Sequence, residues 1–355
     1  MLRLEARGDV SRAMIYLTPV LAVVLTVFSG ALLFKGMGFD TVEALYVFFI
    51  APLVSSTGLP ELFLKAMPIV LCAVGLAIGF RANVWNIGAE GQFTLGAITG
   101  GAVALGFYGV DMPFLLPLMV IAGTLGGMAW AAIPAFFRTR FNAHEILVSL
   151  MLTYVALLLL SYLVHGPMRD PEGFNFPESR LFQDAALLPK IIEGTRLHVG
   201  ALITLLAVAG CWVLIARHVI GFQIRVVGIA PKAASFAGFS QKKLIWFTLL
   251  LSGGLAGMAG LFEVAGPIGQ LTPKISPGYG FTAIIVSFLG RLHPVGVTLA
   301  GLLMALTYLG GETAQIRLGM PSAVTGVFQG MLLFWLLASD VLIRYRIRSG
   351  GVAHG

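Results

Sequence analysis

The chain has 355 residues, of which 58% are hydrophobic and only 11% are charged. Too few polar residues remain to cover a soluble globule of this size, so the composition excludes an ordinary water-soluble protein and indicates an integral membrane protein. The formal net charge of +7 is gathered mainly at the ends of apolar runs. This placement favours contact with membrane lipid headgroups over binding of nucleic acid.

Apolar runs long enough to cross a bilayer as helices, about 20 residues each, recur along the chain. They lie at 13–34, 62–80, 88–109, 113–137, 143–165, 197–216, 243–265 and 322–343. The segment 278–311 is divided at Arg291, His293 and Pro294, so we expect either two short spans or a re-entrant hairpin there. The sequence therefore predicts an all-α, polytopic membrane protein of about ten spans, with 1–355 forming one transmembrane domain.

Basic residues set the expected orientation, because Lys and Arg concentrate in cytoplasmic loops. When the apolar runs alternate in direction, the basic clusters fall on one side: Arg3, Arg7 and Arg12, then Arg81, Arg138 with Arg140, the loop 217–243, and Arg344, Arg346 and Arg348. We therefore expect both termini and the loop 217–243 to be cytoplasmic. The loop 166–196, which has mixed charges, is then extracytoplasmic.

The segment 81–92 carries the densest cluster of charged and amide side chains between apolar runs. Asn86, Glu90 and Gln92 lie there among glycines, which would allow a broken helix whose free backbone groups line a cavity for a polar solute. The alternative is a cytoplasmic turn in which Arg81 pairs with Glu90. The residues alone leave both interpretations open.

A second polar set lies about half a chain further on. It includes Glu263, Gln270 and Tyr279, whose amide, carboxylate and aromatic groups suit sugar hydroxyls and bases. Buried amides that bridge helices and aromatic residues at a membrane interface would show the same composition. The pattern Gly-x-x-Gly-Gln-x-Thr also occurs twice, at 88–94 and 266–272, which raises the hypothesis of an inverted internal repeat.

Motifs for bond chemistry are missing from the sequence. It contains no nucleotide-binding P-loop, no GxSxG motif and no His or Cys spacing typical of a metal site. Cys72 and Cys211 lie in apolar runs, where we expect them to pack as small hydrophobic side chains. We therefore predict no enzyme activity, no cofactor and no metal, and any ATP that drives the protein would bind to another chain.

Several strings together resemble the permease subunits of ABC importers for nucleosides, within the wider family of simple-sugar and branched-chain amino-acid permeases. They are FRANVWNIGAEGQ (80–92), NAHEILVSLMLTYVA (142–156), GFQIRVVGIAPKAASFAGFSQKK (221–243), LSGGLAGMAGLFEVAG (251–266), SPGYGFTAIIVSFLGRLHPVG (276–296) and LGMPSAVTGVFQGMLLFWLLASD (318–340). The nucleoside subgroup depends mainly on NIGAEGQ and HEILVSLMLTY. Thr153 departs from the Asn that this subgroup has before the Tyr.

The resemblance implies one half of a translocation pathway in the plasma membrane of a bacterium. The implied partners are a second, related permease subunit, ABC ATPase subunits and an extracytoplasmic substrate-binding protein. It also implies that a short cytoplasmic helix docks on the ATPase, with Pro231, Ala233, Ala234, Phe236 and Gly238 as the coupling residues. A solvated basic loop is the alternative for this segment.

Other functions remain open from the residues alone. An ABC permease for a simple sugar such as ribose would have the same fold, and fold-level kinship does not choose between substrates. A self-sufficient ion-coupled secondary transporter could use Glu90, Glu263 or Asp340.

Overall fold

The computed structural model describes residues 2–6, 12–110 and 112–349, so Arg7 of the N-terminal basic cluster lies outside the described residues. Helices are the main elements of the described part, which has one pair of strands, β1 (Leu2–Ala6) and β2 (Tyr345–Ser349). The chain forms two compact units, residues 1–56 with 306–355 and residues 57–305, and helix α13 runs from one unit into the other. The prediction of one domain over 1–355 stays a prediction.

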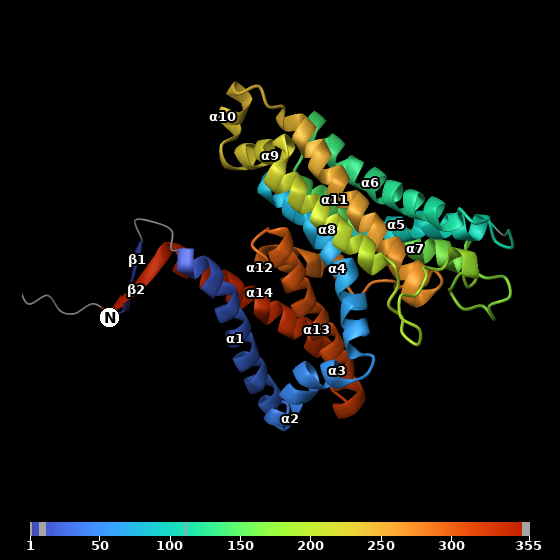
Figure 1. Ribbon diagram of the computed structural model, residues 1–355, viewed down its shortest axis with the longest axis horizontal. Helices are drawn as coiled ribbons and strands as arrows, with labels where there is room; N and C mark the ends of the chain where they lie inside the picture. Colours follow the sequence, from blue (N-terminus) through green and yellow to red (C-terminus); the bar gives the residue numbers. More distant parts are fainter. Residues whose placement is uncertain (1, 7–11, 111, 350–355) are drawn as a thin grey trace, which may run out of the picture. The chain divides into compact units, whose positions relative to one another are not determined.

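The first unit contains the two ends of the described chain. Its elements are α1 (Arg12–Gly36), α2 (Thr41–Leu45), the π-helical turn η1 (Tyr46–Ile50), α3 (Ala51–Val54), the end of α13 (Pro294–Leu318) and α14 (Ala323–Arg344). Helices α1 and α14 lie side by side, and the antiparallel strands β1 and β2 pair Leu2 with Ser349 through Ala6 with Tyr345 (Figure 1). The two ends of the described chain are therefore neighbours.

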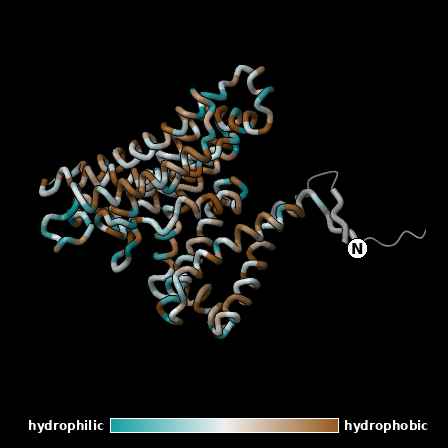
Figure 2. Tube along the Cα trace, turned by 180° about the vertical axis from the view of Figure 1, so that it is seen from behind, coloured by the Kyte–Doolittle hydropathy of each residue, from teal (hydrophilic) through white to brown (hydrophobic). Residues whose placement is uncertain are grey.

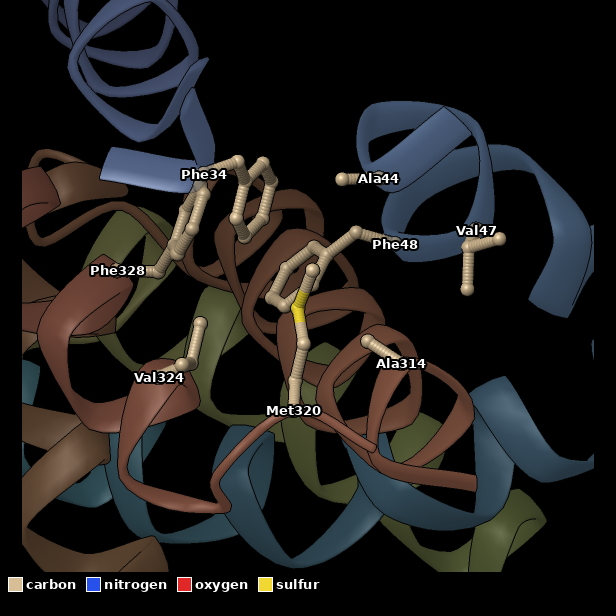
Figure 3. Close-up of a cluster of buried hydrophobic side chains, with 8 residues drawn as sticks. All are labelled: Phe34, Ala44, Val47, Phe48, Ala314, Met320, Val324 and Phe328. Atoms are coloured by element: carbon tan, nitrogen blue, oxygen red, sulfur yellow. The ribbon is translucent and has the colours of Figure 1, made fainter. Parts of the chain in front are cut away.

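A cluster of aromatic side chains forms the core of this unit. Phe34, Phe48 and Phe328 are buried, and the ring centroids of Phe48 and Phe328 lie 4.6 Å apart in a stacked arrangement (Figure 3). Their partners in the cluster are Ala44, Val47, Ala314, Met320 and Val324. The rings join α1 and η1 to α14, since burial of each ring removes a large apolar area from solvent.

The second unit is a bundle of helices. Its elements are α4 (Gly58–Arg81), α5 (Ala89–Gly106), α6 (Leu115–Phe141), α7 (Glu145–His165), the short 3-10 helix η2 (Asp184–Ala186), α8 (Gly200–Arg217), α9 (Val219–Ile229), α10 (Pro231–Phe236), α11 (Gln241–Glu263), the π-helical turn η3 (Val264–Ile268), α12 (Tyr279–Leu289) and the start of α13. Hydrophobic residues run along the helices and hydrophilic ones gather in the connections (Figure 2).

Eight described helices are long and apolar enough to cross a membrane: α1, α4, α6, α7, α8, α11 with η3, α13 and α14. This confirms the predicted polytopic all-α fold. Helix α5 coincides with the predicted run 88–109 but has a polar first turn containing Glu90 and Gln92. The segment 278–311 does divide where expected, but unequally, because α12 has 11 residues and α13 has 25.

Helices α5, α6 and α11 pack unusually closely, because glycines let their backbones touch. A Cβ atom on Gly257 would lie 2.9 Å from the Cα of Gly127, and Gly96 and Gly253 meet backbone atoms of the same helices at similarly short range. Small residues at helix crossings are the usual means of close association within membranes. The three helices form a compact wall (Figure 1).

The first prediction concerns this wall. Gly257→Ala should destabilise the protein by about 1–3 kcal/mol, the usual penalty of overpacking, because backbone atoms rather than flexible side chains would have to move. Gly210→Ala on α8 is the matched control, since no atom lies within 4 Å of its Cβ position. This control should be neutral or stabilising, because Ala favours a helix over Gly. Thermal unfolding midpoints of the purified proteins measure both, and an equal response of the two variants would contradict the close-packing account.

Candidate substrate pathway and coupling surface

Helices α5 and α12 begin beside each other inside the second unit. Gly88 precedes α5 and Gly278, with φ of 106°, precedes α12. The side chain of Glu90, in the first turn of α5, accepts a hydrogen bond of 2.7 Å from the backbone N–H of Gly280 in the first turn of α12. A Cβ on Gly280 would lie 2.6 Å from the Cα of Glu90, so glycine is needed for this approach. We call this meeting of the two helix starts the helix junction.

The helix junction explains how a carboxylate is held in the interior. Glu90 is only 3% exposed. Unpaired N–H groups and the positive end of the helix dipole are both concentrated in the first turn of a helix, and they stabilise a nearby negative charge. The first turns of two helices therefore stabilise the carboxylate of Glu90: that of α12, which it binds, and that of α5, in which it lies.

The amides of Asn86 and Gln92 form a second buried group beside the helix junction. Asn86 Nδ2 donates to Gln92 Oε1 at 2.8 Å, and Gln92 Nε2 donates back to Asn86 Oδ1 at 3.1 Å. Asn86 Nδ2 also lies 3.0 Å from the hydroxyl of Ser252 on α11, and its Oδ1 accepts from the N–H of Gly88. Asn86, Gln92 and Ser252 therefore form one buried network of amide and hydroxyl groups, and nothing in the sequence indicates that Ser252 belongs to it.

Arg81 and Glu90 do not pair with each other in this structure. Arg81 Nε donates to the carbonyl oxygen of Leu292 at 2.9 Å, in the turn between α12 and α13. Nearby, the ring of Phe288 stacks on those of Phe80 and Trp85, and the ring centroids of the three residues lie 5.1–5.8 Å apart. The segment 82–88 is thus non-helical and buried in part, and it leads from the end of α4 to the helix junction.

The second predicted polar set divides between two places. Tyr279 is buried at the helix junction, where its ring contacts the edge of Phe93 with centroids 6.3 Å apart. Gln270 lies beyond η3 and donates from Nε2 to Glu178 of the loop 166–196 at 2.8 Å. Glu263, at the end of α11, is half-buried. The two copies of the Gly-x-x-Gly-Gln-x-Thr pattern differ in conformation, since 88–94 opens α5 and 266–272 ends η3 and continues as a loop.

A small pocket of about 150 Å³ lies where the loop before α8 meets the end of α11. His198 lines it and is 1% exposed. Its Nδ1 accepts from the N–H of Gly200 at 3.2 Å, and its Nε2 has no hydrogen-bond partner among the described residues. Burial lowers the pKa of His198 from 6.5 to about 4. Sequence reasoning missed this residue, because one histidine without a spacing pattern gives no signal.

The segment between α9 and α11 contains the predicted coupling residues. Pro231 starts the six-residue helix α10, Ala233 is exposed, and Ala234 is buried at 1% exposure. Phe236 is 94% exposed. Gly238 ends the turn after α10 with φ of 80° and has no atom within 4 Å of its Cβ position. The short helix α10 lies beyond the end of α9 (Figure 1), and its Phe236 ring is exposed.

Within the described residues, no three His, Cys, Asp or Glu side chains gather closely enough to hold a metal ion. The arrangement offers polar groups at the start of two helices and an exposed short helix. These features fit a protein that binds and moves a solute.

Comparison with known proteins identifies this class. Residues 58–337 match the family described as Branched-chain amino acid transport system / permease component. The chain belongs to this family and is a permease subunit of an ABC importer, a multi-pass membrane protein without catalytic activity of its own. The family resemblance drawn from the sequence is confirmed, and the alternative of a self-sufficient secondary transporter is set aside.

The chain is similar to permeases with different named substrates. It is 38% identical to the glucose ABC transporter permease protein TsgB13 of Haloferax volcanii, over 98% of this chain and 93% of that protein. It is 30% identical to the guanosine ABC transporter permease protein NupP of Bacillus subtilis, over 93% and 94%. It is 27% identical to a second guanosine permease of that organism, NupQ, over 68% and 78%.

The second prediction concerns His198. Its folded-state pKa is depressed, so the fold favours the neutral ring, and stability is complete above pH 6.5. As pH falls from 6.5 towards 4 the unfolded chain gains a proton that the folded chain does not, and up to about 3 kcal/mol of stability is lost. His198→Asn keeps an acceptor for Gly200 and does not titrate. From pH 7.5 to pH 4.5 the unfolding midpoint should fall further for the wild type than for this variant. An equal fall in both proteins would contradict the depressed pKa of His198.

Proposed function

We propose that this chain forms one half of the translocation pathway for a nucleoside or a related small polar solute. The observation that carries the proposal is the helix junction, where Glu90, Tyr279 and the Asn86–Gln92 pair place polar groups at the starts of two helices. Helices that begin within a membrane protein and direct their N-terminal N–H groups at one point are typical of transporter binding sites.

The depth of the helix junction supports this role. Gly91, next to Glu90, packs against Thr153, eight residues beyond the start of α7. At 1.5 Å per residue this is about 12 Å along α7, near the middle of a hydrocarbon core about 30 Å thick. We propose that Asn86, Glu90, Gln92 and Tyr279 belong to the wall of the pathway, with Glu263 and Gln270 towards its outer end.

A nucleoside is favoured as the substrate because the two sequence segments that resemble nucleoside permeases lie side by side at this depth. The segment NIGAEGQ and the helix with HEILVSLMLTY pack together, because the N–H of Ile87 donates to Ser149 Oγ at 3.1 Å and a Cβ on Gly88 would lie 2.8 Å from the carbonyl oxygen of Ser149. A simple sugar is the second candidate, favoured by the 38% identity to a glucose permease. The hydroxyl groups of a nucleoside's ribose and those of a free sugar can form the same hydrogen bonds with these side chains.

Uptake by the assembled importer distinguishes the two substrates. In vesicles that contain the complete complex, we expect ATP-dependent uptake of labelled guanosine that a hundredfold excess of unlabelled glucose does not reduce. Labelled glucose should then enter no faster than in vesicles without ATP. If unlabelled glucose abolishes guanosine uptake, and unlabelled guanosine does not reduce uptake of labelled glucose, the substrate is a sugar and the nucleoside proposal is wrong.

The partners follow from the same proposal. The importer would contain ABC ATPase subunits, an extracytoplasmic binding protein and a second, related permease, as the likeness to both NupP and NupQ of one organism supports. Helix α10 would dock on the ATPase through Phe236, with Pro231, Ala233 and Gly238 around it. Ala234 is buried and would hold α10 in place.

The third prediction tests this docking with two matched phenylalanines. Phe236→Glu should lower the yield of ATPase that co-purifies with this chain by roughly tenfold, because a charge replaces an exposed anchor ring. Phe174→Glu is the control, since Phe174 is 93% exposed and lies in the loop 166–196, which is expected at the opposite face. Equal co-purification of the ATPase by both variants would contradict the docking role of α10.

The orientation is part of the proposal. The pairing of β1 with β2 supports placing both termini on one side of the membrane, and the basic clusters assign that side to the cytoplasm of a plasma membrane.

The fourth prediction tests this orientation in intact cells. Cys72 and Cys211 are buried, so the background reactivity is low. Phe174→Cys should react with an impermeant thiol reagent added outside, whereas Phe236→Cys should react only after the membrane is opened. Ser179, in the same loop, is 2% exposed and would be a poor probe. The reverse labelling pattern would invert the topology.

A further inference from the structure

We infer that a basic pocket between the end of α6 and the start of α11 binds the phosphate headgroup of an anionic phospholipid. The pocket has a volume of about 400 Å³ and is open on one side. Its lining contains three basic side chains and no carboxylate. The lining residues are Arg138, Thr139, Arg140, Phe141, Asn142, Gln241, Lys242 and Ile245. We call this the headgroup pocket.

The positive charge of the headgroup pocket is only partly neutralised. Arg138 Nε lies 3.2 Å from Glu145 Oε2, and this carboxylate is buried behind it. Arg140 and Lys242 are exposed, and neither forms an ion pair with a described residue. Two positive charges thus face an open pocket without a partner, an arrangement that suits a phosphate group with negative charge.

The pocket lies at a membrane face, since both helices are candidate spans and the pocket is at the end of one and the beginning of the other. Phe136, Phe137 and Phe141 surround this end of α6, with ring centroids 5.8 Å apart in each pair, and all three are exposed. A phosphate in the pocket would bring acyl chains against these rings. Basic pockets between spanning helices are the sites that acidic lipid headgroups occupy in other membrane proteins.

The two walls of the headgroup pocket are tied together. Trp246 Nε1, on α11, donates to Thr139 Oγ1, on α6, at 3.0 Å. Thr139 Oγ1 also donates to the carbonyl oxygen of Ala135 at 2.7 Å. The pocket is therefore preformed in the protein, and binding a headgroup does not require the helices to move.

The test is lipid binding to the purified full chain, measured by native mass spectrometry with phosphatidylglycerol and phosphatidylcholine of equal chain length. The wild type should prefer phosphatidylglycerol. Removing both charges, in Arg140→Gln with Lys242→Gln, should weaken phosphatidylglycerol binding by about 25-fold, since each charge contributes about fivefold. Binding of phosphatidylcholine should not change.

Three controls make the result specific. Arg140→Lys with Lys242→Arg keeps both charges and should retain the preference. Arg217→Gln removes an exposed charge at the end of another candidate span and should have no effect. Millimolar inorganic phosphate should fail to displace phosphatidylglycerol, since it lacks the acyl chains.

The proposal is wrong if the wild type binds both lipids equally, or if the double Gln variant keeps its preference. It is also wrong if inorganic phosphate displaces the lipid completely, because the pocket would then bind free phosphate. If the double Gln variant keeps its preference for phosphatidylglycerol but co-purifies with less ATPase than the wild type, the pocket belongs to a protein interface.

Discussion

A buried carboxylate at the starts of two helices is the interaction on which the functional architecture depends. Glu90 is surrounded by protein, yet it lies in the first turn of α5 and accepts a hydrogen bond from the first turn of α12. Leaving a charge unpaired at membrane depth is costly, so the two helix starts must stay together while this charge is inside. The bond between Glu90 and Gly280 thus joins parts of the chain that are 190 residues apart.

The glycine contacts of the surrounding helices make this arrangement possible. Helices α5, α6 and α11 approach until their backbones touch, which leaves little room for large side chains beside the helix junction. Ser252 on α11 is consequently close enough to reach Asn86. Lipid does not drive helices together as water does, so close van der Waals contact and hydrogen bonds between helices carry the packing. The buried polar network around Asn86 and the close packing of the glycine-rich helices therefore depend on each other.

Most of the spanning helices could be predicted from the sequence, because a bilayer requires long apolar runs and this requirement is local. The reversal at Arg291 to His293 was also visible, as basic residues and a proline interrupt an apolar segment. The full length of α13 could not be predicted from the sequence. Its second half is polar, with Glu312 and Gln315, and does not resemble a membrane span. The helix α10 was expected only from the family resemblance.

The residues of the candidate site could be chosen from the sequence, but their partners could not. Glu90, Asn86 and Gln92 stood out because polar side chains are rare between apolar runs. Their neighbours Gly280 and Ser252 are small residues among many similar ones, and they are distant in the chain. Only the three-dimensional packing selects them. For the same reason the sequence suggests Arg81, the nearest basic residue along the chain, as the partner of Glu90, whereas Glu90 accepts from Gly280 and Arg81 donates to Leu292.

The most direct test of the pathway role is the rate of uptake by importers that carry Glu90→Gln, compared with wild type at matched amounts of assembled complex. Glutamine keeps an acceptor oxygen for the N–H of Gly280, so assembly should remain within about twofold of wild type, since the hydrogen bond survives. Loss of the charge should lower uptake per complex by about tenfold, as the loss of one charge-assisted hydrogen bond predicts. Wild-type uptake per complex, whatever the yield, would contradict the account and leave Glu90 with a purely structural role.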